Sequence, residues 1–157
     1  MIKILTYVAS SIAVAALVSA AYANPVTDNG RVPHIVSSVQ FPQSKWRIVR
    51  HTFRLQIPQQ SNPLSQLSID VPVGLRVSSK ISVSDQTGPK VDTNISVDGN
   101  KIVLAFPEPV LSGTELKISM KDVKILGRTN AWLYKVYARL VGIDVDLPIG
   151  FARFRIY

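Results

Sequence analysis

The feature that most constrains the fold is the dipeptide Asp98-Gly99, which lies between two β-prone runs. Asp-Gly is strongly favoured in two-residue hairpin loops, because a type I′ turn requires positive φ at both central residues. With these two residues as the loop, Ile95 opposes Ile102, and cross-strand partners project to the same face. The side chains that this register gathers on one face are Ile95, Ile102, Leu104 and Phe106. The hairpin therefore predicts a β-sheet with one buried side.

Alternating apolar and polar residues predict further strands along the chain. The runs with this alternation are 46–57, 67–71, 73–83 with a turn near 78–79, 114–120 and 149–157. Leu116, Ile118 and Met120 point inward and are expected to extend the apolar face of the hairpin. The segment 132–141 is apolar on both sides, which predicts a central strand buried on both faces, with a helix as the alternative. A short edge segment is expected at 123–125.

About seven to nine short strands, with turn signals every ten residues or so, describe an all-β sandwich or a small barrel. We predict the antiparallel β-sandwich, with the immunoglobulin-like form as its subtype. The predicted organisation is a signal peptide helix at 1–23, a polar, turn-rich lead-in at 24–40, and the sandwich domain at 41–157.

The amino-terminal segment has the pattern of a cleavable secretory signal. Lys3 supplies the positive charge, residues 4–18 the apolar stretch, and Ala21-Tyr22-Ala23 an A-x-A cleavage site. A retained membrane anchor is the alternative. We therefore expect a secreted protein with no transmembrane segment after cleavage, either free or peripherally associated with the envelope.

Composition limits the chemistry and the partners. The chain has no cysteine, so disulfides, thiol catalysis and cysteine-based metal sites are excluded. It has 18 basic and 10 acidic residues, a net charge of +8, and such a surplus favours anionic partners. Export makes nucleic acid a poor candidate. The expected partner is an anionic protein, a lipid headgroup or a polysaccharide of the envelope.

The basic residues recur in pairs two or four positions apart, and within a strand this spacing places both members of a pair on one side. If the strands are neighbours, the pairs form a basic face that binds the anionic partner. The alternative is a solvated surface whose charges protect strand edges from aggregation. The candidate anion-binding residues are Arg50, Arg54, Arg76, Lys80, Lys117, Lys121, Lys135, Arg139, Arg153 and Arg155.

Aromatic residues support an alternative function, a carbohydrate-binding module or weak glycan-active enzyme. Trp46, Trp132 and Tyr134 could stack on sugar rings, although aromatic residues on strands more often belong to the core. His51 has the parity of inward-facing Phe53, which indicates a packed, hydrogen-bonded histidine rather than a catalytic one. We predict no catalytic residue, no metal ligand and no cofactor.

The run from 41 to 157 resembles an uncharacterised family of exported cyanobacterial proteins, the domain of unknown function DUF2808. The resemblance rests on strand cores and turns rather than on a reactive constellation. It implies export across the inner or thylakoid membrane to the periplasm or thylakoid lumen, and hence a partner in the envelope or lumen. It supplies no activity, cofactor or site residue. The matching segments are 51–58 (HTFRLQIP), 67–72 (LSIDVP), 101–114 (KIVLAFPEPVLSGT), 132–138 (WLYKVYA) and 150–157 (GFARFRIY).

The sequence therefore favours a non-catalytic exported β-sandwich that docks on an anionic partner through basic strand faces. The carbohydrate-binding module is the alternative. A third possibility is a structural subunit whose partner adds a strand at an exposed sheet edge.

Overall fold

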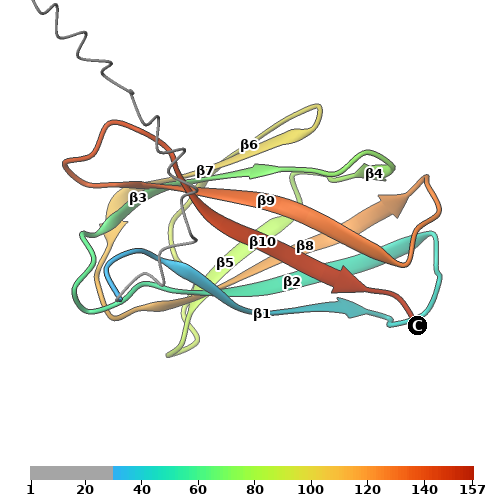
Figure 1. Cartoon of the computed structure of the whole chain (residues 1–157), viewed down its shortest axis with the longest axis horizontal. Helices are drawn as coiled ribbons and strands as arrows, with labels where there is room; N and C mark the ends of the chain where they lie inside the picture. Colours follow the sequence, from blue (N-terminus) through green and yellow to red (C-terminus); the bar gives the residue numbers. More distant parts are fainter. Residues whose placement is uncertain (1–29) are drawn as a thin grey trace, which may run out of the picture.

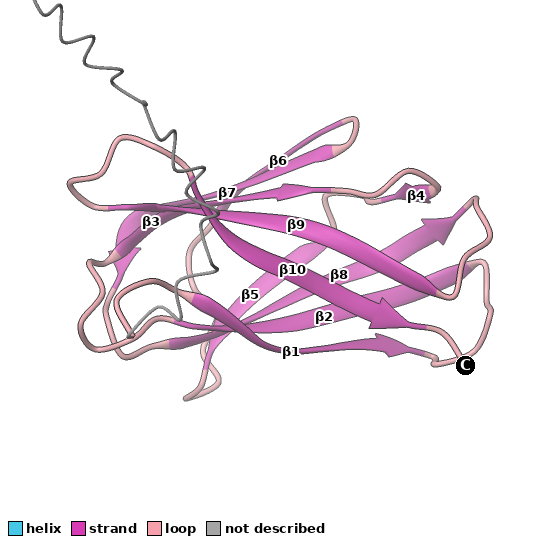
Figure 2. Ribbon diagram, in the orientation of Figure 1, coloured by secondary structure: helices cyan, strands magenta, loops and turns pink. Residues whose placement is uncertain are grey.

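Two antiparallel β-sheets face each other in the computed structural model, which describes residues 30–157 (Figure 1). The described part of the chain contains ten strands and no helix (Figure 2). The strands are β1 (His34–Phe41), β2 (Ile48–Gln56), β3 (Leu64–Asp70), β4 (Leu75–Arg76), β5 (Ile81–Asp85), β6 (Asn94–Asp98), β7 (Lys101–Val110), β8 (Glu115–Ile125), β9 (Ala131–Leu140) and β10 (Leu147–Arg155). The predicted antiparallel sandwich is confirmed, with one strand more than the upper expectation.

The order of the strands divides the chain into sheet A and sheet B. Sheet A has the order β1-β2-β8, and both β4 and β5 pair with the far side of β8. Sheet B has the order β10-β9-β3-β7-β6. Because β2 and β8 are distant in the sequence yet adjacent in sheet A, their outward side chains meet only in the folded chain.

The core lies between the two sheets and is built from the inward half of each alternating strand. Sheet A contributes Phe53, Leu55 and Ile118, and sheet B contributes Leu67 and Ile102, all with no exposed surface. With no cysteine in the chain, burial of these side chains supplies the main driving force for folding, at about 1.5–3 kcal/mol per large apolar side chain.

The hairpin forms with the predicted faces but with a different loop. Asp98 pairs with Lys101, so the two loop residues are Gly99 and Asn100. Positive φ occurs at Gly99, the first central residue, as in a type II′ turn. The register differs from the expected one by two residues, and a shift of two leaves every side chain on its face. Ile95 packs against the core, and Ile102, Leu104 and Phe106 are buried, as predicted.

Three other expectations differ from the structure. Residues 34–40, the last part of the expected polar lead-in, form most of β1, which pairs with β2. Strand β8 runs unbroken to Ile125 and lies in sheet A, so its inward side chains face the hairpin across the core instead of extending its sheet. Strand β9 is buried on one face only, because Leu133 and Lys135 on its outer face are exposed.

A polar network crosses the core beside these apolar side chains. The buried His51 ring contacts the Tyr134 hydroxyl through Nδ1 at 2.6 Å and the Gln40 amide oxygen through Nε2 at 2.9 Å. The Gln40 amide nitrogen donates to the backbone oxygens of Pro42 and Ser44, which orients its oxygen toward His51. An amide oxygen only accepts, so Nε2 carries the ring proton and Tyr134 donates to Nδ1. The network holds the β1–β2 loop to the core.

Candidate functional site: a cationic groove on the outer face of sheet A

Four of the predicted basic residues meet on the outer face of sheet A. Arg54 on β2 pairs directly with Lys117 on β8, so the two side chains project from the same face. Arg50 and Lys121 lie four residues further along their strands on the same face, and all four side chains line one hollow of about 420 Å³. We call this hollow the sheet A groove. The sequence pattern predicted that the two members of each pair lie on the same face of their strand. The adjacency of β2 and β8 in sheet A then brings the two pairs together.

The floor of the sheet A groove is formed by hydroxyl groups. Thr52 pairs with Ser119 between the two rows of cations, and their side-chain oxygens are 3.2 Å apart. Both residues are buried although they face outward, because longer side chains surround them. Ser82 and Ser84 on β5 continue the hydroxyl surface toward the sheet edge. Hydroxyls between cations can donate hydrogen bonds to the oxygens of a carboxylate, sulfate or phosphate.

The cations of the groove are only partly neutralised. Arg54 contacts Glu115 at 3.3 Å, but the Arg54 side chain is exposed and Glu115 is only half-buried, and a pair of this kind contributes little. Arg50 lies over the Phe41 ring, 5.3 Å from its centroid, which orients its guanidinium group. Within residues 30–157, the structure gives no ion pair to Lys117 or Lys121. The groove therefore presents a net positive surface.

The remaining sheet A candidates lie beside the groove. Lys80 precedes β5 and contacts Asp122 at 2.6 Å; the hydrogen bond raises the pKa of Lys80 and lowers the pKa of Asp122. Arg76 on β4 pairs with Lys124, near the end of sheet A. Lys80 is thus compensated, and Arg76 belongs to a different part of the surface.

The other four predicted cations lie on sheet B and form no common site with the groove. Lys135 and Arg139 are on β9, and Arg153 and Arg155 are on the neighbouring β10. Arg139 contacts Asp146 at 3.0 Å. The expected single basic face is therefore two separate surfaces, because the chain places β2 and β8 in one sheet and β9 and β10 in the other.

The aromatic candidates for sugar stacking are divided by burial. Trp132 and Tyr134 face the core and are 3% and 0% exposed, so neither can stack on a sugar. The Trp132 ring packs against Gly74 and Gly127, and Tyr134 contacts His51 and Phe154 edge-on. Trp46, in the loop before β2, is 63% exposed. The inward parity of Trp132 and Tyr134 on β9 explains why the carbohydrate alternative loses two of its three residues.

His51 has the structural role expected from its parity. Burial lowers its pKa from 6.5 to about 4, so the ring is neutral at physiological pH. Burial also raises the pKa of Tyr134 far above its usual value. In the described part of the chain, no three histidine, aspartate or glutamate side chains are placed to hold a metal ion.

Sequence reasoning missed the groove hydroxyls and the basic residues near the β1–β2 loop. Thr52 lies between Arg50 and Arg54, and Ser119 between Lys117 and Lys121, so strand alternation alone could have identified both.

The predicted signal peptide lies outside the described residues. Within residues 30–157, no helix has the length and apolar character needed to cross a membrane.

Comparison with known proteins supports the fold. A family model described as "Protein of unknown function (DUF2808)" matches residues 27–138. No curated protein sequence matches the chain.

Three solved structures share the sandwich architecture. The N-terminal domain of the Streptococcus gordonii adhesin Sgo0707 superposes with a TM-score of 0.56 at 12% identity, over 80% of this chain and 32% of that one. The major pilin GBS80 of Streptococcus agalactiae, as a 35 kDa C-terminal fragment, gives 0.54 at 10% identity over 78% and 56%. ACE19, the collagen-binding subdomain of the Enterococcus faecalis surface protein ACE, gives 0.50 at 12% over 77% and 95%.

The chain thus spans about a third of the adhesin chain and just over half of the pilin fragment. At these identities the likeness establishes the immunoglobulin-like sandwich fold.

Proposed function

Because the chain belongs to the DUF2808 family of proteins of unknown function, we propose its function from the site itself: a non-catalytic module that binds an anionic partner through the sheet A groove. The partner is an acidic polysaccharide, an acidic protein or an anionic headgroup layer outside the cytoplasm. The observation that carries the proposal is the convergence of Arg50, Arg54, Lys117 and Lys121 around a hydroxyl floor.

The geometry of the groove favours an extended polyanion over a small ligand. The groove is open and lies across two central strands, so a chain can lie along it while successive anionic groups meet Arg54 and Lys117, then Arg50 and Lys121. The Thr52 and Ser119 hydroxyls lie between these rows. The adhesin and pilin domains that share the fold are binding and assembly proteins by their names, which agrees with a binding or structural role for this chain. Export to the periplasm or thylakoid lumen is part of the proposal.

The test reverses the charge of the groove. The variant Arg50→Glu, Arg54→Glu, Lys117→Glu and Lys121→Glu is expected to lose retention on immobilised polygalacturonate and on native envelope fractions at low salt. Retention of the unchanged protein should weaken as salt rises, because exposed charges are screened.

A matched control variant carries the same change of charge on sheet B: Lys135→Glu, Arg139→Glu, Arg153→Glu and Arg155→Glu. It should retain most of the binding if the groove is the site. Equal loss in both variants would show that only net charge matters, and undiminished retention of the groove variant would refute the proposal.

A further inference from the structure

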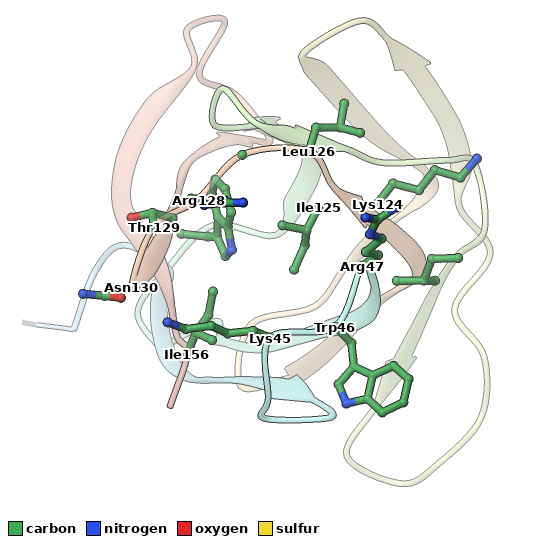
Figure 3. A pocket seen from close by; sticks show the side chains of 13 residues that line it. Lys45, Trp46, Arg47, Lys124, Ile125, Leu126, Arg128, Thr129, Asn130 and Ile156 are labelled. Carbon is green, nitrogen blue, oxygen red and sulfur yellow. The ribbon is translucent and has the colours of Figure 1, made fainter.

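A second hollow, of about 1120 Å³, lies at the end of the sandwich where the β1–β2 loop, the β8–β9 loop and the carboxyl terminus meet (Figure 3). We call the segments 45–48 and 124–128 around it the tip. None of the residues that line this hollow lines the sheet A groove. The tip is therefore a separate surface of the molecule.

Main-chain hydrogen bonds hold the tip in a fixed shape. The Ile125 amide donates to the Arg47 oxygen at 2.8 Å, joining the β1–β2 loop to the end of β8. The Leu126 amide donates to the Gly74 oxygen at 2.7 Å. Gln40 fastens the same loop to the core through Pro42 and Ser44. The surface that the tip presents is thus pre-organised by the fold.

The charge at the tip has one sign. The charged residues that line the hollow are Lys45, Arg47, Lys124 and Arg128, and no aspartate or glutamate lines it. Within residues 30–157, the structure gives none of the four an ion pair. Figure 3 shows these side chains distributed around the opening, from the β1–β2 loop, the end of β8 and the β8–β9 loop. Such a surface attracts a layer of negative charge.

Large apolar side chains protrude beside these cations. Trp46 is 63% exposed and Leu126 is 64% exposed, and both are directed away from the hollow in Figure 3. Val73 and Ile48 at the same end are exposed as well. In Figure 3 the Trp46 and Leu126 side chains lie on opposite sides of the hollow and flank its cations, an arrangement that suits an interaction site. A free polyanion offers no apolar phase for Trp46 and Leu126, whereas a lipid bilayer offers both an anionic surface and an acyl layer.

We propose that the tip docks on the surface of a bilayer containing anionic lipids. Trp46 and Leu126 enter the boundary between headgroups and acyl chains, where tryptophan is favoured because its ring is amphipathic. Lys45, Arg47, Lys124 and Arg128 contact the lipid phosphates, each contributing roughly fivefold in affinity near an anionic surface. This inference goes beyond the proposed function, because it concerns different residues and names one ligand, an anionic lipid bilayer. It leaves the sheet A groove at the side of the sandwich, open to its own partner.

The test uses vesicles of phosphatidylcholine with a minority of phosphatidylglycerol, and phosphatidylcholine alone. The variant Trp46→Ala with Leu126→Ala should bind anionic vesicles at least about tenfold more weakly, since two large apolar side chains no longer enter the bilayer. The control, Leu111→Ala with Val145→Ala, removes exposed apolar side chains at the opposite end and should bind as the unchanged protein does. All variants carry the full chain, so any contribution of the apolar amino-terminal stretch is common to them.

Fluorescence provides a local readout. Emission from Trp46 should shift to shorter wavelength on anionic vesicles and be quenched by brominated acyl chains, whereas buried Trp132 should not respond. The response should be absent in Trp46→Phe. Unchanged Trp46 emission, equal binding of the tip and control variants, or loss of binding only in the sheet A groove variant would each overturn the inference. Retention on polygalacturonate is measured in parallel and tests the proposed function independently.

Discussion

The His51 ring lies between Tyr134 and Gln40 and stacks on Phe154, with ring centroids 4.3 Å apart. Each ring nitrogen already has a partner whose role suits the neutral ring, since the Tyr134 hydroxyl donates to Nδ1. Protonation would add a second N–H donor facing that hydroxyl and a charge within the core. This arrangement explains why the chain keeps a histidine at an inward position and predicts a pH-dependent stability.

We predict that the free energy of unfolding falls as the pH decreases from about 6.5 to about 4. The folded-state pKa of His51 is about 4 and its ordinary value is 6.5, so the unfolded chain binds the proton first. The contribution of the neutral His51 ring to the free energy of unfolding is complete above pH 6.5. Between pH 6.5 and pH 4 it declines by up to about 1.4 kcal/mol per pH unit, roughly 3 kcal/mol in all. Urea unfolding across this range, compared with His51→Asn, measures the effect. An identical pH slope in the two proteins would contradict it.

At the scale of one element, the β6–β7 hairpin has faces that the sequence pattern predicts and a loop that it does not. The faces of Ile95 and Ile102 follow from alternation, and they are as predicted. The loop does not follow from alternation, because shifts of two residues preserve every face. The preference of Asp-Gly for type I′ turns favoured a loop at Asp98 and Gly99. In the structure Asp98 instead pairs with Lys101, which extends the ladder, and Gly99 has the positive φ.

The observed loop predicts different effects on stability for substitutions at two adjacent positions. Gly99→Ala should reduce stability by about 1 kcal/mol, because φ is +56° there and a Cβ is disfavoured in that region. No heavy atom lies near the added methyl group, so packing does not contribute. Asp98→Thr should change stability by less than about 0.5 kcal/mol or increase it, because residue 98 is in an extended strand. Chemical denaturation of both variants measures the difference, and a large loss for Asp98→Thr would support the alternative loop.

At the scale of the whole molecule, the two sheets are joined along the β1–β10 side and at the carboxyl terminus. The Ser38 hydroxyl on β1 donates to the Arg153 oxygen on β10. The Ile156 amide donates to the Asn130 oxygen at 3.1 Å, and the Tyr157 amide to the Gln43 oxygen at 3.3 Å. The last two residues thus connect β10 to the β1–β2 and β8–β9 loops that carry the tip.

Deletion of residues 156–157 should therefore reduce stability by about 1–2 kcal/mol, through two lost hydrogen bonds and the partly buried Ile156 side chain. The thermal midpoint should fall by about 3–8 °C. Tyr157→Ala is the control: its side chain is 79% exposed and its main-chain bond is kept, so we expect less than about 0.5 kcal/mol. Equal midpoints for the deletion and the unchanged protein would show that the terminus does not brace the sandwich.

The sequence by itself determined the class of fold and the face on which most side chains lie. Alternation with a period of two is a local property of an extended chain, so inward Phe53 and Ile118 could be assigned without knowing their neighbours. The same alternation gave the parity of each basic pair.

Only the tertiary structure decided which strands are neighbours, and therefore which pairs form a site. Arg54 meets Lys117 because β8 enters sheet A, while Lys135 lies on the other sheet at the same local spacing. Strand order depends on packing between segments far apart in the sequence, and no local pattern encodes it. For the same reason, burial of Trp132 against Gly74 and the assembly of the tip from two loops emerged only from the folded chain.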